Sequence, residues 1–352
     1  MDLQIKNKIA LVLGGGGGLG GAIALSLAKE GVKVAVADIS IDAAEKTVNL
    51  LKEHGAQAYA IQWDLARLED IETKIATIEA ELGPVDILVN NTGGPPPTTA
   101  HSQDAGVWST HFQSMVVSVI KITDRVLPGM RERKWGRVIT STSSGVVSPI
   151  PNLGISNALR LSLVGWSKTL AKEVGNDGVT VNIVLPGRIA TGRITFLDEA
   201  KAKREGRSVE EVSKESTAAI AVGRYGDPKE YGDVVAFLAS GLAGYLTGST
   251  VRIDGGLISS LRERRDYYAI IVHRANGATE AFADRNAVCH VIEDGYTQYL
   301  AGRAGCASRS ERSKGCRHSL HTSFYSYQSG SDSWWEHQDC NRRDASRKHC
   351  RL

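Results

Sequence analysis

Residues 13–21 read L-G-G-G-G-G-L-G-G and connect a short apolar run to a helical pattern. Within this stretch, Gly14, Gly18 and Gly20 have the spacing G-x-x-x-G-x-G, with Leu19 between the last two. Glycines at a strand-to-helix turn allow a sharp bend, a close approach of the backbone to a pyrophosphate and tight packing of the helix on the sheet. The helix N-terminus adds unpaired N–H groups and a positive dipole end. The stretch therefore predicts the dinucleotide-binding turn of a βαβ unit.

The rest of residues 8–260 alternates β-branched runs with helical patterns. Segments such as A-I-A-L-S-L-A-K-E (22–30) have apolar residues at helical spacing. The strand runs are nearly continuous in Val, Ile, Leu and Ala, which indicates a parallel sheet covered by helices on both faces. We expect a doubly wound α/β (Rossmann) fold in a single domain, residues 1–260, with strands at 8–13, 32–37, 57–62, 85–90, 136–141, 179–184 and 249–254.

Residues 261–352 have a different composition. They hold all five cysteines and none of the nine prolines, and they carry 15 Lys/Arg against 11 Asp/Glu. Residues 268–300 could form a few short strands, whereas 301–352 have few aliphatic residues to bury. We expect 261–352 to be a C-terminal extension that is poorly ordered or non-native. Four residues of the metal-ligating types Cys and His match the spacing of no standard zinc site, so no metal is expected: Cys306, Cys316, His318 and His321.

The overall charge and hydropathy favour a soluble, cytoplasmic protein. A net charge of +3 over 352 residues does not indicate a nucleic-acid or membrane partner. No apolar run approaches the roughly 18 residues that a membrane span needs, and the first residues, M-D-L-Q-I-K-N-K, lack the apolar region of a signal peptide. The absence of Cys from residues 1–260 suits a reducing compartment.

Asp38 ends the second predicted strand, 18 residues after Gly20. A carboxylate at this place accepts hydrogen bonds from the ribose hydroxyls of NAD and repels the 2′-phosphate of NADP. The glycine loop contains no Arg or Lys that could bind this phosphate. We therefore expect NAD as the cofactor, with NADP disfavoured; the alternative is that Asp38 only caps the next helix.

Further motifs follow in a fixed order along residues 1–260. Asp64-Leu65 follows the third strand, N-N-T-G (90–93) the fourth, and P-G-R-I-A-T (186–191) the sixth. G-R-Y-G-D-P (223–228) and Y-L-T-G-S-T-V-R-I-D-G-G (245–256) come last. Together these motifs resemble the short-chain dehydrogenase/reductase family, in particular its 3-oxoacyl-acyl-carrier-protein reductases. The resemblance implies an NAD(P)-dependent oxidoreductase that acts on a carbonyl or a secondary alcohol.

The resemblance also implies roles for residues of these motifs. Asp64 stands at the position of the family's adenine-contacting aspartate, and Thr191 at the position that contacts the nicotinamide amide. The remaining cofactor-binding positions that it implies are Leu65, Asn91, Gly93, Arg160, Pro186, Gly187 and Ile189.

The family's catalytic set is Asn, Ser, Tyr and Lys, and only the Ser is present here. Counting along the motifs places these four positions at Met115, Ser143, Ser156 and Arg160. In the family, the Tyr phenol transfers the proton, the Lys lowers the pKa of the Tyr and holds the ribose, and the Ser binds the substrate oxygen. We expect a divergent subgroup in which Ser143, Ser156 and Arg160 occupy the catalytic positions. For Ser143, capping of the turn after the strand is an equal alternative to substrate binding.

These replacements weaken the expected proton transfer. A serine hydroxyl is a poor base without a partner such as His, and an Arg that stays protonated cannot relay a proton. General acid–base catalysis contributes about 10²–10⁴ in rate. His111, four residues before Met115, could supply the proton instead, or it could pack at a helix–helix dimer surface. Two functions stay open: an oxidoreductase with a degenerate catalytic set, and a non-catalytic dinucleotide-binding protein with a sensing or assembly role.

Three further expectations concern the substrate, the assembly and a second motif. Residues 192–220, where the family's substrate loop lies, contain no diagnostic anchor for a particular small molecule. The resemblance implies a homodimer or homotetramer built on the predicted helices at 104–133 and 155–175. The Y-x-x-x-K pattern at Tyr225 and Lys229 contains a proline, and we interpret it as coincidence.

Overall fold

The computed structural model describes residues 2–259 and four short strands at 269–275, 278–284, 291–293 and 296–298. These residues divide into two units, Met1–Leu261 and Arg262–Leu352. The division lies beside the change of composition near residue 260. Each unit is described by itself.

The first unit is built on a seven-stranded sheet with the order β3-β2-β1-β4-β5-β6-β7, in which every pairing is parallel. The chain starts in the middle of the sheet and builds outward to β3, then returns past β1 to build the other half. This reversal is the doubly wound arrangement that the sequence predicts. The strands are β1 (Ile9–Leu13), β2 (Lys33–Asp38), β3 (Ala58–Gln62), β4 (Ile87–Asn91), β5 (Gly136–Ser141), β6 (Val179–Pro186) and β7 (Thr250–Ile253).

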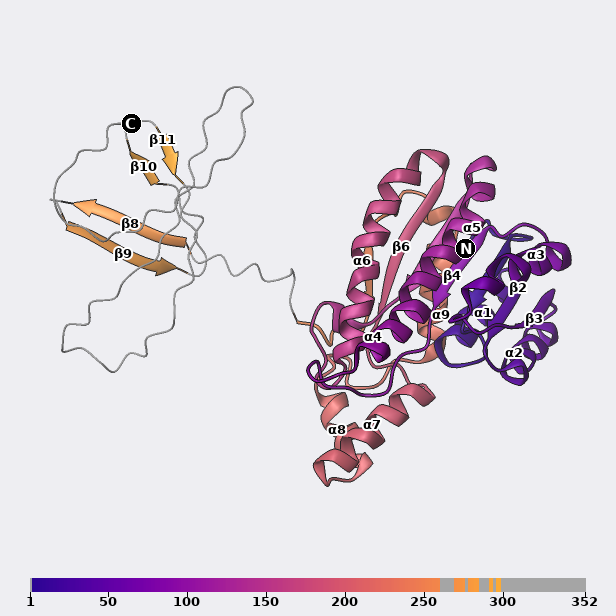
Figure 1. The fold of residues 1–352 in the computed structure, drawn as a ribbon, viewed down its shortest axis with the longest axis horizontal. Helices are drawn as coiled ribbons and strands as arrows, with labels where there is room; N and C mark the ends of the chain where they lie inside the picture. The colour runs from indigo at the N-terminus through magenta and orange to yellow at the C-terminus, as the bar shows by residue number, and fades with distance from the viewer. Residues whose placement is uncertain (1, 260–268, 276–277, 285–290, 294–295, 299–352) are drawn as a thin grey trace. The chain divides into compact units, whose positions relative to one another are not determined.

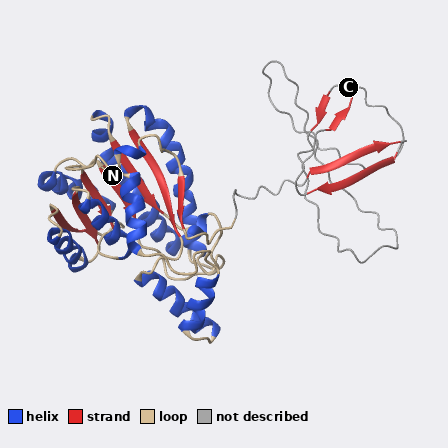
Figure 2. Ribbon diagram, turned by 180° about the vertical axis from the view of Figure 1, so that it is seen from behind, coloured by secondary structure: helices blue, strands red, loops and turns tan. Residues whose placement is uncertain are grey.

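Helices cover both faces of this sheet (Figure 1; Figure 2). The alternation of side chains along β1 explains why: Ala10 and Val12 belong to one buried cluster, and Leu11 and Leu13 belong to the other. On the first face lie α1 (Gly18–Lys29), α2 (Ile41–Glu53) and α9 (Pro228–Leu238). On the second face lie α3 (Ile71–Leu82), α5 (Ser118–Glu132) and α6 (Gly154–Val174).

The helix that leads into α5 contains an irregular turn. Residues 105–132 form one continuous helix, in which α4 (Ala105–Phe112) and α5 are separated by a π-helical segment, Gln113–Val117. Two more helices, α7 (Gly192–Glu205) and α8 (Val209–Ala218), follow β6. Single 3-10 turns occur at Leu68–Asp70, Ser144–Val146, Gly175–Asp177 and Gly241–Ala243.

The starts of several helices are set by local sequence. α9 begins with Pro228 after Asp227, whose carboxylate accepts the Lys229 N–H while Glu230 bonds back to the Asp227 N–H. α8 has the same reciprocal arrangement between Ser208 and Glu211. Such capping boxes satisfy N–H groups that the helix itself cannot pair, so these boundaries follow from the sequence.

The second unit contains two antiparallel hairpins in its described part. β8 (Ala269–Ala275) pairs with β9 (Ala278–Asp284), and β10 (Val291–Glu293) pairs with β11 (Tyr296–Gln298). They lie where short strands are expected. The expected low order of the rest of 261–352 and the prediction for Cys306, Cys316, His318 and His321 lie outside the described residues. In the described part of the chain, no helix is long and apolar enough to span a membrane.

Candidate functional site

The predicted site residues meet at one edge of the sheet, because parallel strands all end on the same side. The first half of the sheet contributes residues after four strands: Gly14, Gly18, Leu19 and Gly20 after β1, Asp38 at the end of β2, Asp64 and Leu65 after β3, and Asn91 and Gly93 at β4. The second half contributes Ser143 after β5, Ser156 and Arg160 in the first turns of α6, and Pro186, Gly187, Ile189 and Thr191 at and after the end of β6.

The glycine loop is shaped by close backbone contacts. Gly14 has φ +58°, and a Cβ on Gly20 would lie 2.0 Å from the Gly14 carbonyl oxygen, so neither position tolerates a side chain. Gly17, which precedes α1, has no side-chain cap, and nothing lies within 4 Å of the place where its Cβ would be. The N-terminus of α1 thus has no side-chain cap and borders open space at Gly17, which suits a bound phosphate.

Asp38 is tied to this loop rather than to the next helix. Its Oδ2 accepts the Gly16 N–H at 2.9 Å, and its Oδ1 accepts the Ser40 N–H at 3.1 Å. The N-cap of α2 is Ser40, whose hydroxyl accepts the Ala43 N–H. The alternative that Asp38 only caps the next helix is therefore wrong, because another residue caps it.

Side chains join the loops after β1, β4 and β6. The Asn91 amide donates to the carbonyl oxygens of Leu13 and Gly14 at 3.3 and 3.2 Å. A Cβ on Gly18 would lie 3.8 Å from Thr191, so the glycine loop and the start of α7 are close neighbours. Asp64 holds its own turn, since Oδ1 accepts the Ala66 N–H at 2.9 Å. These contacts bring Gly14, Gly18, Asn91 and Thr191 together, while the Asp64 bond stays within its own turn.

Arg160 is buried and directs its guanidinium at main-chain oxygens. Nη2 donates to the carbonyls of Thr92 and Gly93 at 3.2 and 3.0 Å, and Nη1 donates to the carbonyl of Ser141 at 3.3 Å. Nε donates to the hydroxyl of Ser156 at 3.4 Å. Burial, with a smaller contribution from the charge of Arg193, lowers the pKa of Arg160 to about 10. Arg160 therefore stays a cation at neutral pH and links the ends of β4, β5 and α6.

Ser143 caps the turn after β5, which is one of the two roles expected for it from the sequence. Its hydroxyl accepts the Gly145 N–H at 3.0 Å and so caps the 3-10 turn after β5. A hydroxyl that accepts one bond can still donate its own proton, and Ser143 is only half-buried. Turn capping and binding of a substrate oxygen are thus compatible in this residue.

The buried phenol of Tyr231 lies beside the end of β5, but it does not replace the catalytic Tyr of the family. The Tyr231 hydroxyl is 2.8 Å from the hydroxyl of Ser141, and Tyr231 is fully buried. Burial raises its pKa far above neutrality. Tyr231 therefore stays a neutral core residue that cannot be reached by a substrate.

The helix position of the family's Asn falls in the π-helical segment. Met115 is buried among apolar residues of α6, including Ile155 and Leu159. His111 precedes the segment and is half-buried. A π turn shifts the phase of the residues on its two sides, and such turns are frequent at functional sites. His111 and Met115 are therefore in different environments in spite of their four-residue spacing.

The loop after β6 carries one functional candidate that the sequence analysis missed. Arg193 donates from Nη2 to the carbonyl oxygen of Pro95 at 2.7 Å, in the loop after β4. This bond joins α7 to the main chain of another loop, and the prediction that 192–220 contains no diagnostic anchor stays a prediction. An arginine in the first turn of α7 was a visible signal, but its direction depends on packing against a segment almost a hundred residues away.

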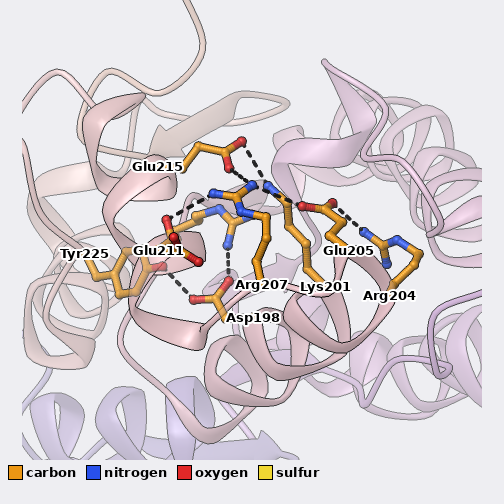
Figure 3. A network of polar contacts seen from close by, with 9 residues as sticks. Asp198, Lys201, Arg204, Glu205, Arg207, Glu211, Glu215 and Tyr225 are labelled. Carbon is orange, nitrogen blue, oxygen red and sulfur yellow. Dashed lines mark hydrogen bonds and ion pairs between the residues drawn. The ribbon is translucent and has the colours of Figure 1, made fainter.

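A polar network fixes α7 beside the site (Figure 3). The carboxylate of Asp198, which is buried, accepts from Arg188 at 2.7 Å and from the Tyr225 hydroxyl at 2.6 Å. Lys229 pairs instead with Asp233. Tyr225 and Lys229 thus have separate structural partners, which agrees with the interpretation of their Y-x-x-x-K spacing as coincidence.

Comparison with known proteins shows the family. The family described as Enoyl-(Acyl carrier protein) reductase matches residues 15–258. Nodulation protein G of Azospirillum brasilense is 37% identical over 254 residues, which cover 72% of this chain and 99% of that protein. The 3-oxoacyl-[acyl-carrier-protein] reductase of Vibrio cholerae is 35% identical over 257 residues, with coverage of 72% and 99%. This chain belongs to the short-chain dehydrogenase/reductase family.

A solved structure supports the same assignment. L-sorbose reductase from Gluconobacter frateurii, in complex with NADPH and L-sorbose, has a TM-score of 0.70 and 29% identity, covering 74% of this chain and 100% of that one. The expected oxidoreductase class and the resemblance to 3-oxoacyl-acyl-carrier-protein reductases are confirmed. The non-catalytic alternative finds no support among these relatives.

Proposed function

We propose that this short-chain dehydrogenase/reductase uses NAD(H) to interconvert a small carbonyl compound and its secondary alcohol. The observation that carries this proposal is the meeting of the glycine loop, Asp38, Thr191, Ser143 and Arg160 at one edge of the sheet. The dinucleotide supplies or accepts the hydride. The relatives and the complex with NADPH support a nicotinamide cofactor and a small carbonyl or alcohol substrate.

Different residues of the chain would hold the different parts of the dinucleotide. The N–H groups at the start of α1 hold the phosphates, and Asp38 accepts from the ribose hydroxyls. Ile39, which follows it, is 66% exposed and provides an apolar surface for the adenine beside Asp64 and Leu65. Thr191 and the carbonyls of the loops after β4 and β6 hold the nicotinamide side. Arg160 fixes the loop after β4, against which the second ribose lies.

The site is poorly equipped for proton transfer to or from the substrate oxygen. Ser143 donates a hydrogen bond to the substrate oxygen, while Ser156 accepts from Arg160 and lacks a base of its own. Arg160 stays charged, so it stabilises negative charge on the substrate oxygen without releasing a proton. Water, or His111, is left to move the proton. We propose slow turnover rather than loss of activity.

The same helices that flank the site offer an assembly surface. Val107, Phe112 and Leu161 are 37%, 44% and 50% exposed, and they lie on α4 and α6. Apolar side chains of this size on two neighbouring helices suit burial against a second copy. We propose a homodimer or homotetramer formed through these helices, as the family resemblance implies.

The preference for NAD over NADP is tested by Asp38→Asn. The amide oxygen can still accept the Gly16 N–H, while the negative charge that repels a 2′-phosphate is removed. We expect the ratio of NADPH to NADH dissociation constants to fall at least about tenfold, because like charges in contact disfavour binding. Fluorescence titration with both cofactors measures the ratio. Asp42→Asn, an exposed acid on α2, is the control and should leave it unchanged.

The activity itself is tested by NADH binding and single-turnover reduction of a panel of small ketones. We expect binding together with slow oxidation of NADH in the presence of at least one ketone. Tight NADH binding without hydride transfer to any member of the panel would overturn the proposed function. If turnover is found, His111→Ala decides between water and His111: unchanged turnover removes His111 from the proton path.

A further inference from the structure

Within residues 2–259, two arginines converge on the loop after β4 without a carboxylate partner. A Cβ on Gly94 would lie 3.3 Å from Nη2 of Arg193 and 3.4 Å from Nη2 of Arg160, so both cations face the same peptide. Every hydrogen bond that they make within residues 2–259 goes to a main-chain carbonyl or to the Ser156 hydroxyl. Arg188, by contrast, lies only five residues before Arg193 and is paired with Asp198.

This arrangement is unfavourable as it stands. Burial disfavours a charged group that has no counter-charge, and here a second cation lies close enough to lower the pKa of Arg160 further. The Arg193 guanidinium also lies over the ring of Phe196, with its central carbon 5.6 Å from the ring centroid. An oriented guanidinium with spare donors matches the two oxygens of a carboxylate. The missing negative charge would come from a ligand.

We propose that Arg193, supported by the charge of Arg160, binds a carboxylate of the substrate, so that the substrate is a small oxo acid or the corresponding hydroxy acid. This inference rests on the proposed function and names its substrate class. Arg160 contacts the carbonyl of Ser141, two residues before Ser143. The carboxylate and the reacting oxygen can therefore belong to one small molecule.

The cofactor's phosphates are the other source of negative charge. The proposed function already places them at the start of α1, where no side chain caps the helix and Gly17 borders open space. Arg193 instead contacts Pro95 in the loop after β4. A substrate carboxylate is therefore favoured over the pyrophosphate, and the two sources make different predictions for cofactor affinity.

The test compares oxamate, an unreactive oxo-acid analogue, with its neutral amide, oxamide, by calorimetric titration of the NADH-bound enzyme. We expect oxamate to bind about tenfold more tightly or better, because bonds between charged groups are the strong ones. In Arg193→Gln this preference should fall below about twofold, and Arg193→Lys should keep part of it. Arg204→Gln, on the same helix and paired with Glu205, is the control and should keep all of it.

The outcomes separate this inference from the proposed function. Equal binding of the two probes by the wild-type enzyme, or no binding of either one, overturns the carboxylate assignment while NADH binding still stands. A preference that survives in Arg193→Gln, with weakened NADH binding, assigns Arg193 to the cofactor and also overturns it. Failure of the wild-type enzyme to bind NADH contradicts the proposed function itself. Thermal unfolding of each variant shows that the loss is not a folding defect.

Discussion

Replacing Ser156 by Tyr and Arg160 by Lys in one variant is expected to raise kcat for ketone reduction by about 10²–10⁴-fold. These two positions lie four residues apart on α6, and Nε of Arg160 already reaches the hydroxyl of Ser156. A phenol beside a Lys ammonium has a lowered pKa and can give or take the proton that a serine cannot. Stopped-flow measurement of NADH oxidation at several pH values would show both the rate and a new titration of the rate near neutrality.

The matched control is Ser156→Phe with Arg160→Lys, which has the same volume without the hydroxyl. It should remain as slow as the wild-type enzyme. If both double variants are equally fast, the gain comes from the lysine or from altered packing, and the proton-transfer interpretation is wrong. Because Lys cannot reach all the carbonyls that Arg160 binds, both variants should lose some stability, which thermal unfolding will detect.

Gly20→Ala is expected to abolish dinucleotide binding and to destabilise the fold by at least about 2 kcal/mol. Its methyl group would lie 2.0 Å from the Gly14 carbonyl oxygen and 3.0 Å from the Asn91 amide nitrogen, so the loop after β1 must shift. This shift would move the start of α1 away from the contacts that position it. Thermal unfolding and NADH fluorescence titration measure the two effects.

Substitution of Gly17, in the same loop, tests NADH binding without an expected loss of fold stability. Gly17→Ala introduces a methyl group with nothing within 4 Å, so the melting temperature should not fall. Its methyl group would occupy the space in front of the helix N-terminus, and NADH affinity should fall about tenfold or more if phosphate binds there. Gly175→Ala, also free of contacts, is the control for both measurements. Normal NADH affinity in Gly17→Ala would place the phosphates elsewhere.

Asp38, Asn91 and Arg193 differ in how much of their role can be recognised in the sequence. Asp38 was identified from its place at a strand end, and the structure shows it bonded to the glycine loop. The position of Asn91 was implied only by the family motif, yet its amide physically joins β4 to the glycine loop. Arg193 was missed, because a charged residue in a helical stretch carries no sign of which distant loop it contacts.

The sequence alone determined the doubly wound sheet and the glycine turn, which follow from local spacing and from the rule that parallel strands end at one edge. The catalytic positions Ser143, Ser156 and Arg160 were implied by the resemblance to the family. Only the tertiary structure decided that Arg160 binds three main-chain carbonyls and that Arg193 faces the same loop. Long side chains have several rotamers of similar energy, and packing between segments far apart in the sequence selects among them.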